Sequence, residues 1–479
     1  MSPILIIFII AFYFLALYGI SYVTGKNASN LTFFLGNRKS PWYLVAFGMI
    51  GASLSGVSFI SVPGWVGSSQ FSYLEIVIGY FAGYLVIGIV LMPVYYRMQL
   101  TSIYTYLGER FGHFSYKSGA SFFLLSRTVG SALRLFLSAS VMQLVLFQHL
   151  GIPFWLTTII IIFFIYIFTY KGGIRTVVFT DTIQTAFMLA SLVICVFILS
   201  HKLGLNFSGM VKTIYHSNYS KIFFFEHWSD KRFFLKQFFS GAFIAIAMTG
   251  LDQDLMQKNL SCKNLKEAQK NMFWFTLTLL PVNLLFLSLG AMLYIFSIKT
   301  GFPLPLHSDD LFPNIATQSF MPAFFSVIFI LGLVSTTYSS SDSALTALTT
   351  SFTIDILGAQ KKGEEHLAKT RKLVHILMAL FLLLLIMIFK IINNQSIISA
   401  VFTAAGFTYG PLLGMFAFGL FTKWQVKDKW VPVVAVLSPL ICLVLYLGFP
   451  NTFGFEILII NGCLTFLGLF FLRKYRKAE

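Results

Sequence analysis

Continuous apolar stretches of about 20 residues recur along almost the whole chain, and they limit what it can fold into. A stretch of this length suits a helix that crosses the hydrocarbon core of a bilayer, whereas a transmembrane β-barrel would show shorter segments of alternating polarity. Only 11% of the residues are charged and the mean hydropathy is +0.81, so most of the surface must face lipid. We therefore predict an all-α polytopic membrane protein, built as a single transmembrane domain over residues 1–479.

The apolar runs number about thirteen and divide the chain into three parts. They are centred on residues 3–23, 43–68, 74–96, 119–148, 152–170, 177–200, 236–256, 271–297, 321–352, 373–391, 397–421, 431–448 and 455–472. We predict an extra N-terminal helix at 1–24, a ten-helix core at 41–421 and two C-terminal helices at 430–472. Ten core helices can form two sets of five with opposite orientations, as in inverted-repeat transporters. Helix count alone supports this repeat, so a chance agreement stays open.

The net charge of +17 lies largely in short loops between the apolar runs. In a soluble protein this charge would suggest nucleic-acid binding, but Lys and Arg in short loops are the topology signal of a membrane protein. With the N-terminus outside, most of these loops fall on the cytoplasmic side, and the long loop at 201–235 is the exception. We predict a multi-pass protein of a bacterial inner membrane, with its N-terminus outside, its C-terminus in the cytoplasm and no nucleic-acid partner.

The second apolar run carries helix-weakening residues at mid-membrane depth. Gly48, Gly51 and Gly56 are followed by the pair Pro63-Gly64. Backbone carbonyls that lose their helical partners are tolerated at this depth only where they line a cavity or bind an ion. The alternative is a tightly packed helix interface built from small residues.

The ninth run places a dense row of side-chain oxygens in the middle of a span. Hydroxyl groups can bond back to their own helix, so they are weak signals alone. Asp342 is stronger, because a carboxylate at the bilayer centre costs at least about 2.5–3.5 kcal/mol. Helical spacing puts Ser339, Asp342 and Ser343 on one stripe and Thr336 and Ser340 on an adjoining stripe. One helix could therefore serve two neighbouring ion sites.

A second carboxylate, Asp181, stands at or just inside the sixth run. A hard monovalent cation prefers several oxygen ligands, and Asp181 together with the Ser339 stripe would supply them. The alternative is an interfacial carboxylate that pairs with Arg175.

Two arginines lie seven residues apart on one face of the fourth run. We expect Arg127 to pair with an aspartate inside the membrane. Arg134 lies deeper, and its planar guanidinium suits a substrate carboxylate, with a structural ion pair as the alternative. At the end of the seventh run, Asp254 and Lys258 are expected only to mark the exit of the helix from the membrane.

Several short motifs, taken in order, resemble the sodium:solute symporter family, which includes the sodium/glucose cotransporters, the proline symporter and bacterial sialic acid symporters. They are Gly172-Gly173, Phe179-Thr180-Asp181-Thr182-Ile183-Gln184, Asp252-Gln253, Gln257-Lys258, Tyr338-Ser339-Ser340 and Thr353-Ile354-Asp355. The resemblance implies a LeuT-like fold of two inverted five-helix repeats with flanking helices, which alternates access to a central site. It also implies that one or two sodium ions are bound, and we expect a single copy to be functional.

The resemblance also implies where ions and substrate bind. The first sodium site would use the carbonyls of Gly51, Leu54 and Thr336 with the hydroxyls of Ser339 and Ser340. A possible second site would use Asp181, Ser339, Asp342 and Ser343, with Asp342 standing where relatives carry serine. The substrate pocket would use Ser53, Ser55, Ser58 and Arg134, completed by Gln70, Phe71 or Tyr73.

From these residues we predict a sodium-coupled symporter that imports a small polar solute, with sialic acid or another acidic sugar as the leading candidate. A neutral sugar or an amino acid is the alternative substrate. Proton coupling through Asp342 or Asp181 and a membrane receptor that binds without transporting are the alternative functions. We do not expect an enzyme, because the sequence shows no nucleophile with a matching base.

Overall fold

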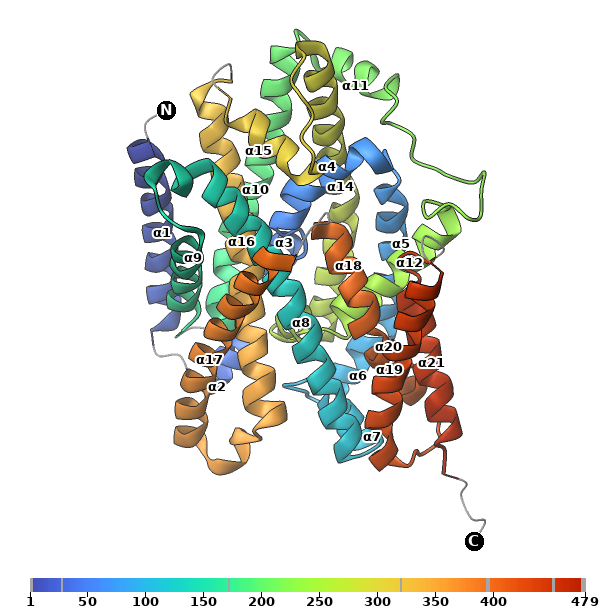
Figure 1. Cartoon of the computed structure of the whole chain (residues 1–479). Helices are drawn as coiled ribbons and strands as arrows, with labels where there is room; N and C mark the ends of the chain where they lie inside the picture. The colour runs from blue at the N-terminus through green and yellow to red at the C-terminus, as the bar shows by residue number, and fades with distance from the viewer. Residues whose placement is uncertain are drawn as a thin grey trace.

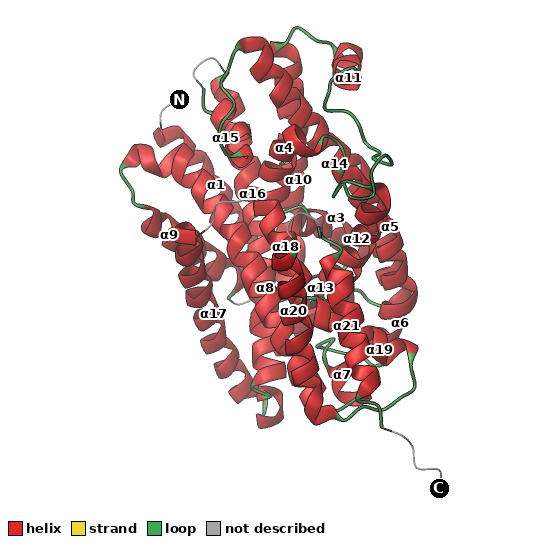
Figure 2. Ribbon diagram, turned by 45° about the vertical axis from the view of Figure 1, so that its right-hand side comes forward, coloured by secondary structure: helices red, strands yellow, loops and turns green. Residues whose placement is uncertain are grey.

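The chain folds into a bundle of helices, as the apolar runs predict (Figures 1 and 2). This computed structural model describes residues 3–26, 29–170, 173–318, 321–392, 397–449 and 453–474. The side chains of residues 3–7 and 149 lie outside that description. Within the described ranges the chain forms helices and two isolated β-bridges, with no β-strand.

The α-helices follow the predicted runs closely. They are α1 (Pro3–Gly25), α2 (Asn30–Leu35), α3 (Trp42–Ser53), α4 (Gly56–Ser69), α5 (Tyr73–Val86), α6 (Met92–Arg97), α7 (Thr105–Arg110), α8 (His113–Met142), α9 (Phe154–Thr169), α10 (Gly173–Lys202), α11 (Phe207–Tyr215), α12 (Phe234–Ala245), α13 (Gln253–Leu260), α14 (Leu265–Thr300), α15 (Leu311–Ala316), α16 (Ala323–Ser351), α17 (Glu364–Ile392), α18 (Ile397–Thr408), α19 (Gly410–Phe421), α20 (Val431–Gly448) and α21 (Ile457–Phe471). Short 3-10 or π-helical segments join or extend them. These are η1 (Gly36–Arg38), η2 (Ile87–Leu91), η3 (Gln143–Phe147), η4 (Gln148–Leu150), η5 (Ile246–Gly250), η6 (Ser308–Asp310), η7 (Phe352–Ile356), η8 (Ala359–Lys362) and η9 (Asp428–Trp430).

Helix length and apolar composition alone identify fewer membrane crossings than the thirteen predicted. Eight described helices are long and apolar enough to cross a bilayer, and three bent helix pairs raise the count to as many as eleven. The shorter apolar helices α9 and α21 would bring the total to thirteen if both also cross. The count of thirteen therefore stays a prediction.

Three spans are broken rather than continuous. The axis bends by 53° between α3 and α4, by 64° between α12–η5 and α13, and by 46° between α18 and α19. The first break was predicted from glycine and proline, but the other two were not. If α3–α4 is the first span of the predicted ten-helix core, α12–α13 is the first span of its second set of five. Breaks at corresponding positions of two halves are what an inverted repeat produces.

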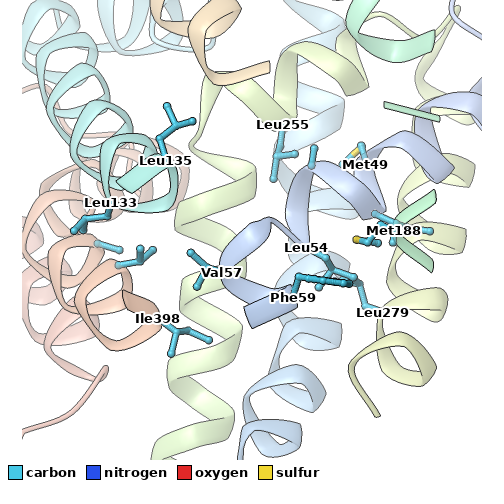
Figure 3. Packing of buried hydrophobic residues seen from close by; sticks show 14 of the residues in the cluster. Met49, Leu54, Val57, Phe59, Leu133, Leu135, Met188, Leu255, Leu279 and Ile398 are labelled. Atoms are coloured by element: carbon cyan, nitrogen blue, oxygen red, sulfur yellow. The ribbon is translucent and has the colours of Figure 1, made fainter. Parts of the chain in front are cut away.

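The first break lies at the centre of the bundle (Figure 1). Apolar side chains from five other helices pack around it, and Figure 3 draws part of this cluster. Those labelled are Met49, Leu54, Val57, Phe59, Leu133, Leu135, Met188, Leu255, Leu279 and Ile398. Because this packing is dry and dense, the polar backbone at the break is shielded from both lipid and bulk water.

Candidate functional site

The break between α3 and α4 leaves a row of backbone carbonyls without partners. Leu54 has φ −93° and ψ 75°, and Ser55 is extended, so the helical hydrogen-bond pattern stops at Ser53 and resumes at Gly56. In the part of the chain that the structure describes, no hydrogen bond reaches the carbonyls of residues 51–54. A buried carbonyl without a partner costs free energy, so these four oxygens are well suited to a cation.

At the second broken span, tyrosine side chains donate hydrogen bonds to backbone carbonyls. The Tyr95 hydroxyl donates to the carbonyl of Gly250 at 2.9 Å, and the Tyr104 hydroxyl donates to that of Leu251 at 2.9 Å. Asp252 caps the start of α13 by accepting from the amide of Asp254 at 2.8 Å. The carbonyls of Gly250 and Leu251 are therefore already used, whereas those of residues 51–54 have no such partner among the described residues.

Helices α3, α10 and α16 meet at Gly51, where only glycine fits. A Cβ atom at this position would lie 2.2 Å from Thr185 Oγ1 and 3.1 Å from Ser339 Oγ. The Gly51 amide donates to Thr185 Oγ1 at 3.1 Å, and the Ser339 hydroxyl donates to Asp181 Oδ1 at 2.8 Å. The structure thus brings the predicted residues Gly51, Ser339 and Asp181 together. Thr185 was missed, although it lies one helical turn after Asp181.

The other predicted ligands of the first sodium site flank this meeting point. Leu54 is buried at the end of α3. The Thr336 carbonyl accepts from the Ser340 hydroxyl at 3.2 Å, and that hydroxyl also contacts the carbonyl of Thr337 at 3.3 Å. Since a carbonyl and a hydroxyl oxygen each keep a second lone pair, these hydrogen bonds leave both oxygens able to bind a cation.

Asp181 is fully buried and is already paired with a positively charged group. Its Oδ2 atom accepts from Lys258 Nζ at 2.6 Å, and the side chain of Lys258 is 1% exposed. Asp342 is also buried, within electrostatic range of both groups, and its Oδ1 atom accepts from the amide of Ser343 at 2.6 Å. The alternative pairing of Asp181 with Arg175 is wrong, because Arg175 is exposed while Asp181 faces α13.

A second buried ion pair lies beside the first and corrects one expectation. Arg127 contacts Asp254 directly and Asp252 at 3.7 Å, which confirms its predicted pairing with an aspartate inside the membrane. The expectation that Asp254 and Lys258 only mark a helix exit is wrong. Both are buried, because α13 turns back into the bundle after the 64° bend.

The predicted second sodium site is only partly assembled. Asp181, Ser339 and Asp342 lie together, but the Ser343 hydroxyl donates to Asp254 instead. The physical reason is that Asp254, fixed by Arg127, offers the Ser343 hydroxyl a charged acceptor. Among the described residues, no cluster of three or more His, Cys, Asp or Glu could hold a metal ion, so a site built from such side chains is not offered there.

A small cavity opens on the other side of the first break. Its volume is about 70 Å³, and its lining includes the predicted substrate residues Ser53, Ser55, Ser58, Tyr73 and Arg134. The sequence analysis missed the lining residues Tyr80, Tyr84 and Thr249. Ligand pockets usually measure hundreds of cubic ångströms, so the surrounding helices must separate before a sugar can enter.

The structure does not bring Gln70 and Phe71 to this cavity. Gln70 adopts a left-handed φ of 56° just after α4, which turns the chain away from the break. The Phe71 amide then donates to the carbonyl of Lys221 at 3.0 Å, beneath the loop that follows α11. Glu75 Oε1 fixes the same loop by accepting from the amide of Phe224 at 2.9 Å. Phe71 therefore belongs to the outer loop contact, and neither Gln70 nor Phe71 is part of the cavity lining.

Arg134 and Arg127 both line the cavity, but their charges differ in availability. Arg127 is neutralised by Asp252 and Asp254. The Arg134 guanidinium has no hydrogen bond or ion pair with any residue in the described ranges. Its positive charge is therefore available to an anionic group that enters the cavity.

Polar atoms without partners continue beyond the ion pairs toward the N-terminal half of α16. The Tyr13 hydroxyl of α1, the Ser335 hydroxyl of α16 and both amide atoms of Gln184 of α10 are buried and unpartnered within the described chain. Gln184 lies one turn after Asp181, and Ser335 one turn before Ser339. A buried water that bridges such groups would satisfy them. The sequence analysis did not identify this cluster, because a lone Tyr, Gln or Ser carries no signal at a single position.

Comparisons with known proteins agree with this geometry. A family model described as "Sodium:solute symporter family" matches residues 33–427. The sodium/sialic acid symporter SiaT of Proteus mirabilis is 23% identical over 462 residues, which cover 93% of this chain and 91% of the relative. The sodium/sialic acid symporter NanT of Aliivibrio fischeri is 24% identical over 425 residues, which cover 84% and 80%.

A solved structure supports the fold. It is described as the substrate-bound outward-open state of a Na+-coupled sialic acid symporter, and it matches with a TM-score of 0.85 at 19% identity, covering 98% of each chain. The all-α polytopic fold of LeuT-like type is therefore confirmed, as is the resemblance drawn from the sequence motifs.

The Arg127–Asp254 pair should hold the bundle together at the cavity. We expect Arg127→Met to destabilise the protein by about 3–5 kcal/mol, because it leaves a buried carboxylate unpaired. Combining Arg127→Met with Asp254→Leu should recover part of this loss, since the double variant buries no unpaired charge at position 254. Thermal unfolding of the purified protein in detergent measures both effects.

Lys369→Met is the matched control. It removes a cation from an exposed pair in which Lys369 Nζ lies 2.7 Å from Glu365, and it should cost no more than about 0.5 kcal/mol. Equal stability of Arg127→Met and Lys369→Met would contradict a structural role for the buried pair.

Proposed function

The chain belongs to the sodium:solute symporter family, and we propose that it couples inward sodium movement to the import of an acidic sugar, with sialic acid as the leading candidate. The observation that carries this proposal is the row of free carbonyls at residues 51–54. It begins at Gly51, which packs against the Ser339 hydroxyl, and that hydroxyl donates to the Asp181 carboxylate. These are oxygen ligands of the mixed kind that a hard cation prefers. The sialic acid symporters named among its relatives support the choice of substrate.

The first sodium site is proposed at the junction of α3 and α16. The ligands are the carbonyls of Gly51, Leu54 and Thr336 and the hydroxyls of Ser339 and Ser340. A sodium ion there would satisfy carbonyls that the broken helix leaves without partners, so it would favour the conformation in which α3, α4 and α16 are in contact. Ion binding and substrate binding would then be coupled, because the same break also forms one wall of the substrate cavity.

We propose that one sodium ion, rather than two, is bound in each cycle. Two carboxylates, Asp181 and Asp342, share the single ammonium group of Lys258, which leaves one net negative charge if all three are ionised. One sodium ion at the first site balances that charge. A second ion at Asp181 would have to displace Lys258, and the freed ammonium group would then be a buried charge without a partner, which is unfavourable.

An acidic sugar fits the polar groups of the cavity. The carboxylate would bind the free guanidinium of Arg134, and sugar hydroxyls would bind Ser53, Ser55, Ser58 and the ring of tyrosines around them. A neutral sugar or amino acid would leave Arg134 without a counter-charge in a small cavity inside the bundle, which is unfavourable. Proton coupling through Asp342 or Asp181 is less well supported, because Lys258 already neutralises one of the two carboxylates.

The remaining features of the proposal follow from the fold. The chain would lie in a bacterial inner membrane with its N-terminus outside and its C-terminus in the cytoplasm, as the positive loops favour. Because one copy supplies every proposed ligand, we propose that a monomer is functional. The core at 41–421 would carry transport, flanked by the helix at 1–24 and the helices at 430–472. Transport involves no covalent step, so no catalytic residue is proposed.

Removing the Ser339 hydroxyl should weaken sodium binding. We expect Ser339→Ala to raise the sodium concentration for half-maximal uptake by about 10- to 100-fold, since a hydrogen bond or ligand contact to a charge contributes about 1.5–3 kcal/mol. Ser341→Ala is the control, because the Ser341 hydroxyl donates to its own helix at Thr337, 2.6 Å away. Uptake of labelled sialic acid into proteoliposomes under an imposed sodium gradient gives both values. Flux that ignores sodium and follows the pH gradient would overturn the sodium mechanism.

Replacing Lys258 should change the ion stoichiometry. In Lys258→Met, Asp181 and Asp342 lose their shared counter-charge, so we expect a second sodium ion to bind and the Hill coefficient for sodium to rise from about 1 toward 2. Thermal stability should also become much more sensitive to the exchange of potassium for sodium. A Hill coefficient of 2 in the unmodified protein would refute the single-ion proposal.

Replacing Arg134 should weaken the binding of acidic ligands more than that of neutral ligands. We expect Arg134→Ala to raise the KM for sialic acid by about 10- to 100-fold, and Arg134→Lys to recover only part of the loss because it lacks the planar fork. An amide analogue of the sugar carboxylate should be affected much less. Equal loss for the acid and its amide would show that Arg134 does not bind the carboxylate.

A further inference from the structure

A groove on the outer face of the bundle shares no lining residue with the cavity at the first break. It runs between α1 and the C-terminal half of α9, which stand side by side at one edge of the molecule (Figures 1 and 2). Its volume is about 720 Å³, which is within the range of ligand-sized pockets. Aromatic side chains form most of its walls, and they include Phe14, Tyr18, Phe164, Phe168 and Tyr170.

The groove has one polar end, where α1 and α9 both finish. Tyr170 lines the groove there, and Lys372 Nζ of α17 lies 5.9 Å from the centre of its ring. Lys26 follows the lining residue Tyr22 by one helical turn and is exposed. Positive charge from two separate segments therefore gathers where the aromatic walls end.

A buried arginine beside this end has unused hydrogen-bond donors. Arg371, next to Lys372, is 6% exposed and within electrostatic range of Tyr170. Its guanidinium packs 4.3 Å from the ring of Phe33, and its Nε and Nη1 atoms find no partner among the described residues. The nearby carboxylate Glu364 is held by Asn30 and forms no ion pair with Arg371 in those ranges. A nearly buried guanidinium without a counter-charge is a ready site for a phosphate group.

We propose that the groove between α1 and α9 binds an anionic phospholipid, with an acyl chain along the aromatic walls and the phosphate at Arg371, Lys372 and Lys26. An uncharged lipid would leave these three cations unmatched. A zwitterionic headgroup would bring a cation of its own into a positive region, so the charge favours an anionic headgroup. In the orientation proposed above, this end faces the cytoplasmic leaflet. Its lining residues and these three cations are separate from the proposed sodium ligands and substrate residues.

The test compares two lipids with the full-length protein in detergent. Dioleoyl phosphatidylglycerol should raise the melting temperature by at least about 3 °C more than dioleoyl phosphatidylcholine, because a ligand that binds only the folded state stabilises it. Lys372→Gln, at an exposed position, should reduce this difference, and Arg371→Gln with Lys372→Gln should abolish it. Lys369→Gln removes an exposed cation that is paired with Glu365, and it should leave the difference unchanged.

Two further experiments test whether the lipid binds in the groove and whether its acyl chains are needed. Ala11→Trp fills the groove without changing its charge, so it should weaken the phosphatidylglycerol effect while sodium-dependent uptake is retained. Glycerol phosphate, which is a headgroup without acyl chains, should give no stabilisation at the same concentration. Equal effects of the two lipids, equal losses in Lys372→Gln and Lys369→Gln, or a full effect from glycerol phosphate would each overturn the proposal. Because Lys372 and Ala11 are exposed, a folding defect at buried Arg371 cannot hide the result.

Discussion

The structure depends on one constraint, which is that every backbone polar group inside a membrane needs a partner. A continuous helix meets this constraint by itself, so each broken span has to be satisfied from elsewhere. At the α12–α13 break, the hydroxyls of Tyr95 and Tyr104 supply the partners. At the α3–α4 break no described residue does so, which leaves a cluster of oxygens whose natural partner is a cation. Two breaks of similar geometry therefore differ in role because different side chains face them.

Helix α13 connects the two polar regions of the bundle. Asp254 and Lys258 lie one turn apart on this short helix, and both are buried. Asp254 binds Arg127, which lines the substrate cavity, while Lys258 binds Asp181, whose other oxygen accepts from Ser339. A displacement of α13 would therefore disturb the groups around both proposed sites. Such a shared element is what reciprocal coupling between two ligands requires.

The fold was more predictable from sequence than the site. Apolar runs of membrane-spanning length located the spanning helices, since lipid enforces this pattern along each run. The polar starts of α8, α14 and α17 lie six to nine residues before their runs. The residues on one helix stripe, such as Ser339 and Asp342, were also identified by their spacing. Apart from the pairing of Asp181 with Ser339 and of Arg127 with an aspartate, contacts between helices were not, because spacing along one helix does not say which neighbour it faces. Ser343 therefore turned out to bind Asp254, and the exit signal expected at Lys258 proved to be a buried ion pair.

Lys258 also explains how the proposed ion site could fold before sodium arrives. Asp181 and Asp342 sit close together in a dry interior, where two unpaired carboxylates would repel each other and each would cost several kcal/mol, by order of magnitude. The tethered ammonium group removes most of that cost, and it leaves a charge deficit that one small cation can fill. A site without the lysine would bind sodium more tightly but would depend on it for stability. A transporter must release its ion on the inner side, so the weaker and self-supporting arrangement is the one that suits repeated turnover.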